Sequence, residues 1–334
     1  MSLAERVGQL FMVDCPTAGI APDTVTAIRQ YHVGAIILDG TSDRSMSEIA
    51  ALTSQLENDN PSVAKLFIAT DQEGGEVQRL QGPGFDAIPS AVEQGQLDPT
   101  DLRSRARAWG QQLRGVGVNV NLAPVLDTVP AGSPSNPPIG DLDREYGHAP
   151  AVVTAHGVQY VIGMLQANVA ATIKHFPGLG RVSGNTDTTS GVTDSVTTRN
   201  DPYLAPFAAA VSDHVPFVMM SSAIYSKIDP GIPAAFSATI VTGMLRGDLG
   251  FNGVVVSDDL GAAVQVSGYP MDDRAVRFIA AGGDMVLTVD ASTVAVMRAA
   301  VLAKAQSDSS FRAKVNAAAL RVLQAKQRFG LLGV

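Results

Sequence analysis

Short apolar runs alternate along this chain with segments in which apolar residues recur every three or four positions. Brief runs rich in Val and Ile are typical of buried parallel strands, and the three-to-four spacing is typical of helices packed on one face. The predicted strands are Gln9–Cys15, Val33–Leu38, Leu66–Thr70, Val118–Val125, Val169–Ile173, Phe217–Met220, Gly253–Val256 and Asp284–Thr288. The predicted helices are Met46–Leu56, Asp101–Arg114, Ala151–Leu165, Tyr203–Val211, Thr239–Leu245, Asp273–Ala281 and Phe311–Phe329.

Eight strands alternating with helices predict an α/β fold, a (β/α)8 TIM barrel. The 334 residues contain no long linker or shift of composition, so we expect a single domain over residues 1–334. A doubly wound open sheet is the rival, but no Gly-rich dinucleotide turn follows the first predicted strand. The last helix, which Gly330 ends, is expected to pack on the closed barrel.

The predicted strands end in polar, ionisable residues. The fifth strand runs into Lys174 and His175, and a Pro/Gly turn follows them. A structural ion pair and a packed His would explain these two residues alone, but several other strands end in the same way. Two long Pro- or Gly-rich loops, 129–150 and 178–202, follow strands as well. Because the carboxyl ends of barrel strands meet on one face, we expect a ligand site there.

Composition narrows the possible partners and compartments. The net charge is −8 and Lys and Arg occur singly, so a nucleic-acid partner is not expected. The one cysteine, Cys15, excludes an internal disulfide and is predicted to be a small buried hydrophobe. No apolar run reaches the roughly 20 residues of a membrane span. The sequence as written predicts a cytoplasmic protein, or a secreted or lipid-anchored one if an export signal has been removed.

The strand ends collect carboxylates, cations and hydroxyls on one face of the predicted barrel. These residues are Asp71, Glu73, Glu76, Arg79, Asp127, Asp141, Asp143, Arg144, Lys174, His175, Ser221, Ser222, Ser257, Asp258, Asp259 and Asp290. Dense donors and acceptors suit a polyhydroxylated sugar, and an ionised carboxylate among them can attack an anomeric carbon. A metal site is the competitor, but no His-x-x-x-His or similar spacing appears, and no metal or cofactor is expected. A Schiff base on Lys174 would indicate an aldolase-type lyase instead.

Five segments, DQEGGEVQRL, NVNLAPVLDT, KHFPGLG, PAAFS and GVVVSDDLGAA, resemble glycoside hydrolase family 3. The resemblance is to the bacterial β-N-acetylglucosaminidase branch and runs from Leu3 to the last helix. It implies a (β/α)8 barrel, retention of configuration and a small saccharide substrate from peptidoglycan or chitin-like chains. It also argues against the lyase. We expect a monomer or weak homodimer.

By this resemblance Asp258, the Asp directly after the Ser of SDDL, is the nucleophile, and Asp259 supports its loop. The positions that match sugar-holding residues of the family are Asp71, Arg79, Arg144, Lys174 and His175. The segment around Arg144 has two residues more than the family pattern, Gly-Asp-Leu-Asp-Arg-Glu-Tyr, so its register is open.

The departure from the family is at the proton donor. The branch uses an Asp-x-His dyad on a mobile loop and usually reads KHFPGHG, whereas this chain has Leu179 and Asp187-Thr188-Thr189. None of the five His residues lies in residues 178–202. Asp187 or Asp194 is then a candidate acid/base, and His148 is a weaker one. The alternative to an active glycosidase is a sugar-binding protein that has lost efficient hydrolysis; we favour the enzyme, with Asp187 as acid/base.

Overall fold

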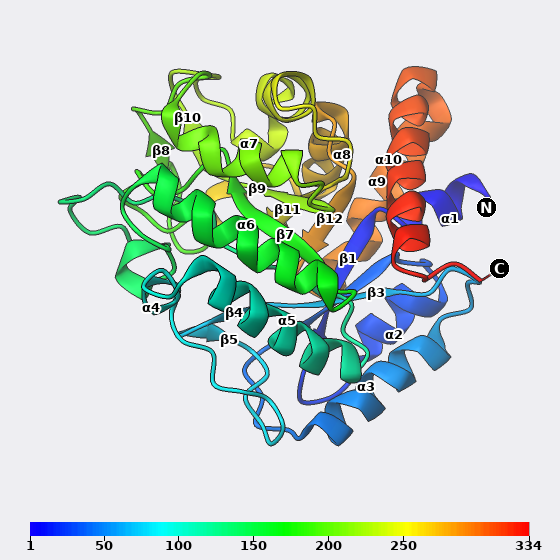
Figure 1. Cartoon of the computed structure of the whole chain (residues 1–334). Helices are drawn as coiled ribbons and strands as arrows, with labels where there is room; N and C mark the ends of the chain where they lie inside the picture. Colours follow the sequence, from blue (N-terminus) through cyan, green and yellow to red (C-terminus); the bar gives the residue numbers. More distant parts are fainter. Residues whose placement is uncertain (334) are drawn as a thin grey trace.

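The computed structural model describes residues 1–333, and eight parallel strands in it close into a barrel (Figure 1). Strand β1 pairs with both β2 and β12, which closes the ring. The order around the barrel is β1-β12-β11-β9-β7-β6-β3-β2. The strands are β1 (Phe11–Pro16), β2 (Ala35–Asp39), β3 (Phe67–Thr70), β6 (Val120–Asn121), β7 (Ala170–Phe176), β9 (Phe217–Met220), β11 (Val254–Asp259) and β12 (Met285–Thr288). The predicted (β/α)8 barrel is therefore confirmed.

Side chains from the strands fill the interior of the barrel. The rings of Phe67 on β3 and Phe217 on β9 meet edge to face, with centroids 5.2 Å apart. Since β3 and β9 are not neighbours in the sheet, these rings meet across the barrel axis. Every residue of β3, β7, β9 and β12 is buried, as expected for strands that are covered on one side by helices and on the other by the core.

Strand β6 is much shorter than the predicted run Val118–Val125. Only Val120 and Asn121 form a continuous ladder with β3 and β7. Pro124 has no N–H to donate, so the ladder stops before it, and pairing resumes as one bridge between Val125 and Lys174.

Helices surround the barrel. They are α1 (Leu3–Gly8), α2 (Pro22–Arg29), α3 (Met46–Asp59), α4 (Ala91–Gln94), α5 (Pro99–Gly115), α6 (Pro150–Gln166), α7 (Ala205–Ser212), α8 (Met271–Ala281), α9 (Val294–Ser307) and α10 (Ser309–Arg328). Residues Thr239–Asp248 (η4) wind as a π-helix where an α-helix was predicted. The Asp98 carboxylate accepts from the Thr100 N–H at 2.8 Å and caps α5. Helices α2, α4 and α9 were not predicted.

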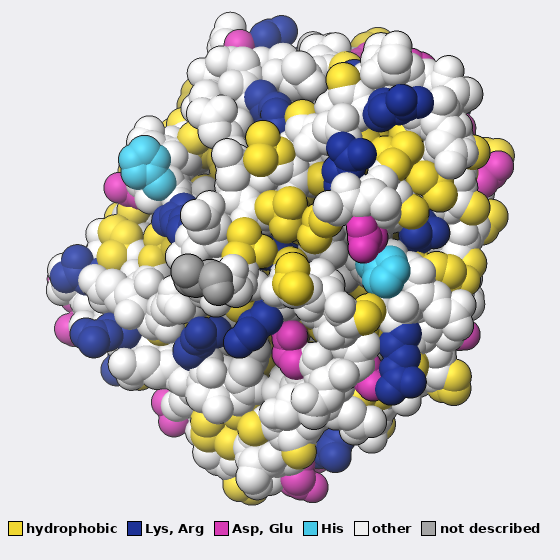
Figure 2. Space-filling view, turned by 90° about the vertical axis from the view of Figure 1, so that its right-hand side faces the viewer, with side chains coloured by type: hydrophobic (Ala, Val, Ile, Leu, Met, Phe, Trp, Pro, Cys, Tyr) yellow, Lys and Arg dark blue, Asp and Glu magenta, His cyan; other side chains and the backbone are white. Residues whose placement is uncertain are grey.

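The two ends of the barrel differ in structure. Both chain ends lie near the amino ends of the strands, where Ala64, ahead of β3, bridges to Leu332 (Figure 1). This end shows interspersed basic, acidic and apolar side chains (Figure 2). The opposite end carries two small sheets, β4 (Gln72–Gly74) with β5 (Val77–Gln78), and β8 (Thr193–Asp194) with β10 (Ile224–Tyr225). No helix among residues 1–333 is long and apolar enough to cross a membrane.

Candidate active site

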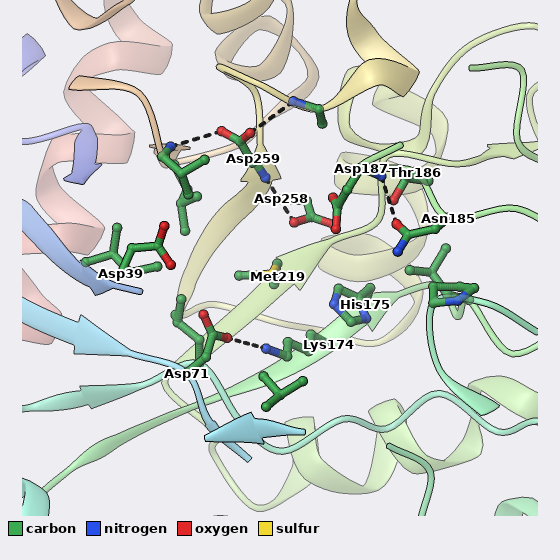
Figure 3. Close-up of a pocket in the computed structure, with 18 of the residues that line it drawn as sticks. Asp39, Asp71, Lys174, His175, Asn185, Thr186, Asp187, Met219, Asp258 and Asp259 are labelled. Carbon is green, nitrogen blue, oxygen red and sulfur yellow. Dashed lines mark hydrogen bonds and ion pairs between the residues drawn. The ribbon is translucent and has the colours of Figure 1, made fainter. Parts of the chain in front are cut away.

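A cavity of about 420 Å³ opens at the carboxyl ends of the strands (Figure 3). It is lined by side chains from β2, β5, β7, β9, β11 and β12 and from the loops that follow the barrel strands. All seven residues predicted for the site line it: Asp71, Arg79, Arg144, Lys174, His175, Asp187 and Asp258. Within residues 1–333, no group of three or more His, Cys, Asp or Glu side chains has an arrangement that would hold a metal ion.

A buried network of charges forms one wall of this cavity. The Lys174 ammonium lies 2.6 Å from Asp71 Oδ1 and 2.6 Å from Glu73 Oε1. The Arg144 guanidinium donates to both oxygens of Glu73, at 2.9 and 2.7 Å. Burial alone would raise the pKa of Glu73, but Arg144 and Lys174 outweigh it and lower that pKa to about 2. Glu73 therefore stays ionised and holds two cations beside the cavity.

Arg144 reaches the cavity despite the two extra residues before it. Residues Gly140–Leu142 (η1) form a 3₁₀ turn, and Asp143 follows in the left-handed region at φ 53°. This compact turn absorbs the additional length. Arg144 Nη1 then donates to the Pro138 carbonyl at 2.6 Å, which fixes the guanidinium on Glu73. Arg144 therefore lines the cavity in spite of the longer segment before it.

A second buried carboxylate, Asp127, fixes His175. Asp127 Oδ2 lies 2.7 Å from His175 Nδ1, and its Oδ1 accepts from the backbone N–H groups of His175 and Leu179, at 3.1 and 2.8 Å. Because an ionised carboxylate only accepts, the ring donates from Nδ1 and keeps Nε2 available for a ligand. Leu179, which replaces a family His, is itself buried. Sequence analysis gave no role to Glu73 or Asp127; their only signal was a carboxylate at a strand end.

Asp258 and Asp259 point to different surroundings. Asp258 lines the cavity, and its Oδ1 accepts from the Asp259 N–H at 2.9 Å. No Lys or Arg in the described chain, residues 1–333, forms an ion pair with it. Burial raises the pKa of Asp258 to about 6; His175 opposes this rise, and the charge of Asp187 adds to it. Figure 3 shows Asp187 beside Asp258.

The Asp259 carboxylate instead accepts hydrogen bonds from the backbone. It accepts from the N–H groups of Gly261, Ala262, Ala263 and Val289 at 2.8–3.1 Å. These four bonds hold the loop after β11 in place. This agrees with the predicted supporting role.

Only one of the three sequence candidates for the acid lies in the cavity. Asp187 lines it, and Thr189, which stands where the family has His, is exposed. Asp194 is fully buried and caps a turn by accepting from Val196 N, Thr197 N and Thr197 Oγ1, so it is not available. His148 is largely exposed, with Nδ1 3.1 Å from the Val129 carbonyl, and does not line the cavity. The alternatives Asp194 and His148 were wrong.

A closed parallel barrel with paired carboxylates and cations at its carboxyl end is typical of barrel enzymes that act on sugars. The family model described as the N-terminal domain of glycosyl hydrolase family 3 matches residues 2–325. The chain therefore belongs to glycoside hydrolase family 3 and is a glycosidase.

Several relatives carry more specific names. A β-N-acetylhexosaminidase from Beutenbergia cavernae has the same fold with a TM-score of 0.96 and 49% identity, over 98% of this chain and 99% of that one. A β-hexosaminidase of Xylella fastidiosa is 35% identical over 258 residues, 73% of this chain and 74% of its own length. The β-hexosaminidase LpqI of Mycobacterium tuberculosis is 31% identical over 300 residues, 88% of this chain and 75% of its own.

Proposed function

We propose that this protein is a retaining β-N-acetylhexosaminidase. It removes terminal β-linked N-acetylglucosamine, or a related hexose, from peptidoglycan-derived or chitin-like saccharides. The observation that carries this proposal is the placement of Asp258 in the cavity, facing Asp187, beside the charge network of Glu73. The names of the relatives support the sugar. Residues 1–334 act as one domain, and the protein is a monomer or weak homodimer.

In the first step the ionised Asp258 attacks the anomeric carbon. A bond forms from a carboxylate oxygen to that carbon, and the bond to the leaving oxygen breaks as Asp187 gives that oxygen a proton. In the second step Asp187 takes a proton from water, the water oxygen bonds to the anomeric carbon, and Asp258 is released. Two carboxyl groups of one cavity thus serve as nucleophile and as acid/base. The bound sugar has to leave Asp258 ionised and the proton on Asp187, although burial and the charge of Asp187 favour a proton on Asp258 in the protein alone.

The remaining site residues hold the sugar ring. Lys174 and Arg144 are oriented by Glu73 and donate to hydroxyls, while Asp71 accepts from them. His175 offers Nε2, and Arg79 lies at the edge of the cavity, 3.9 Å from Asp39. Because Asp187 lines the cavity beside Asp258 and can supply the proton there, an impaired sugar-binding protein is not the favoured function.

The test is hydrolysis of an aryl β-N-acetylglucosaminide with a good leaving group, beside the matching β-glucoside. We expect the first to be cleaved faster, with retention of configuration in the initial product by NMR. Asp258→Ala should abolish cleavage. Equal or faster cleavage of the glucoside would overturn the choice of sugar, and an inverted product would overturn the covalent step.

A further inference from the structure

The loop that carries Asp187 is fastened to the segment that follows β11. The backbone N–H of Val264 donates to the Asp187 carbonyl at 3.1 Å, and that of Gln265 donates to the Thr186 carbonyl at 3.0 Å. The Gln265 side chain adds two bonds farther along the loop. Its Oε1 accepts from the Val192 N–H at 2.9 Å, and its Nε2 donates to the Val192 carbonyl at 3.1 Å.

These four bonds hold the loop on both sides of the Asp187 side chain. Residues 186–187 are held on one side and Val192 on the other, while a local turn shapes the stretch between them. In that turn Asn185 Oδ1 accepts from the Asp187 N–H at 2.9 Å, and the Asn185 carbonyl accepts from the Thr189 N–H at 2.8 Å. With its carbonyl bonded to Val264, the Asp187 backbone turns its carboxylate toward Asp258 (Figure 3).

Gln265 is the side chain that joins the segment after β11 to this loop, and it is buried. Its Oε1 accepts from the Val192 N–H, and its Nε2 shares the Val192 carbonyl with the Ile224 N–H, so removal of the amide leaves the Val192 N–H without this acceptor. The bonds from the backbone of Val264 and Gln265 depend on the same segment. Without the amide, fewer bonds hold the loop on the Val192 side, and a displacement of about 1 Å at a reacting group can lower a rate by about 10²-fold.

We propose that Gln265 is a positioning residue for Asp187, holding the β7–α7 loop so that the Asp187 carboxylate stays opposite the nucleophile. The proposal rests on the function given above, in which Asp187 is the acid/base. It explains how a carboxylate on a long surface loop is kept at a defined place in the cavity. The strand that carries Asp258 and the loop that carries Asp187 then act as one unit.

The experiment compares Gln265→Met with the wild type on two β-N-acetylglucosaminides, one with a good aryl leaving group and one with an alkyl leaving group. Met has nearly the same size but makes neither bond. An aryl leaving group barely needs a proton, so kcat/KM for the alkyl glycoside should fall by about 10²-fold, as for loss of general acid help. The aryl glycoside should be affected at least ten times less. In an Asp187→Asn background, Gln265→Met should lower the alkyl rate no further.

A matched control is Asn119→Leu. The Asn119 side-chain amide also bonds to a single neighbouring segment through both its oxygen and its nitrogen. It accepts from the Ile68 N–H at 2.9 Å and donates to the Leu66 carbonyl at 3.1 Å. It lies at the amino end of the barrel, so this variant should lower the melting temperature and leave the ratio of the two rates unchanged. Gln265→Glu keeps the acceptor and loses the donor, and its ratio should fall between those of wild type and Gln265→Met.

The outcomes distinguish a failure of Asp187 as acid/base from a failure of Gln265 as its positioning residue. If Asp187→Asn leaves the ratio of the two rates unchanged, the assignment of Asp187 fails and the positioning role falls with it. If Asp187→Asn lowers the alkyl rate selectively but both Gln265 variants lower the two rates equally, Gln265 is only structural. If Gln265→Met lowers kcat/KM for the alkyl glycoside further in the Asp187→Asn background, the positioning role is also overturned.

Discussion

The two ends of the barrel each bury a carboxylate between two cations, yet only one end is a site. At the amino end Asp284 is fully buried, pairs with Arg246 and Arg321, and accepts from the Val255 N–H at 2.8 Å. At the carboxyl end Glu73 pairs with Arg144 and Lys174. Buried ion pairs of this kind do not by themselves distinguish function from structure.

The difference lies in what surrounds each network. The network of Asp284 ties η4, β11, β12 and α10 together, whereas that of Glu73 borders a cavity of about 420 Å³. In that cavity Asp258 has a backbone N–H as its hydrogen-bond donor and another carboxylate beside it. This carboxylate, which has no Lys or Arg partner among residues 1–333 and borders the cavity, is the one that we propose as the reacting group.

The sharpest way to test this comparison is to neutralise one carboxylate at each end. Asp258→Asn should lower kcat/KM by at least about 10⁴-fold, as expected for a catalytic carboxylate. Its melting temperature at pH 8 should not fall. Burial raises the pKa of Asp258 from 3.8 to about 6, so the ionised form is less favourable in the folded chain and weakens folding above pH 6. Kinetics and thermal melts measure both effects.

The matched variant at the amino end is Asp284→Asn. It leaves Arg246 and Arg321 without their carboxylate, and removal of one member of a buried ion pair is worth about 3–5 kcal/mol. The free energy of unfolding should fall by that amount, while kcat/KM below the melting transition stays within about twofold of wild type, since this residue lies far from the cavity. A large kinetic effect of Asp284→Asn with unchanged stability would contradict the comparison.

A smaller effect is expected when the charge network of the site is broken. Glu73→Gln removes the carboxylate that orients Arg144 and Lys174, so kcat/KM should fall by about 10²-fold through misplaced sugar contacts. Stability should fall by about 3 kcal/mol, because two buried cations lose a partner. Glu57→Gln, whose carboxylate accepts from the Leu66 N–H at the amino end, is the control and should leave the kinetics unchanged. Unaltered sugar binding in Glu73→Gln would remove this network from the site.

The smallest expected effect is on pH dependence. The nucleophile must be ionised, so kcat/KM for an aryl glycoside should fall as the pH drops through the pKa of Asp258, about 6. The charge of Asp187 raises the pKa of Asp258, and Asp187→Asn should therefore move this acidic limb to lower pH. A limb that stays in place in Asp187→Asn would show that the two carboxylates do not interact.

The barrel strands follow from the sequence because most of them are short runs of mainly buried, apolar residues. Boundaries and irregular elements follow less well. The ladder of β6 ends early at a proline, and the hairpin of β4 and β5 depends on the Gln72 amide, which bonds to both backbone groups of Leu80. Neither feature appears as a periodic pattern of apolar residues in the sequence. One depends on a missing backbone N–H and the other on a side-chain contact to the backbone.

The residues that line the cavity were predictable, and those that position them were not. The strand ends and the loops that follow them bring the seven predicted residues to one face whatever their neighbours are. In contrast, Glu73 meets Arg144 across 71 positions of the chain, and Asp127 meets His175 across 48. No short-range pattern in the sequence indicates that such distant residues form pairs. The π-helix η4 and the clamp of Gln265 on Val192 have the same origin in tertiary contacts.

The most direct test of the central claim is to trap the covalent intermediate. A fluorinated N-acetylglucosaminyl fluoride, which reacts with the enzyme quickly and is released slowly, should add the mass of one sugar to the intact protein. Peptide mass spectrometry should then place the sugar on Asp258, in the segment Ser257-Asp258-Asp259. A sugar on Asp259 or Asp187, or turnover of substrate without any trapped adduct, would contradict the account.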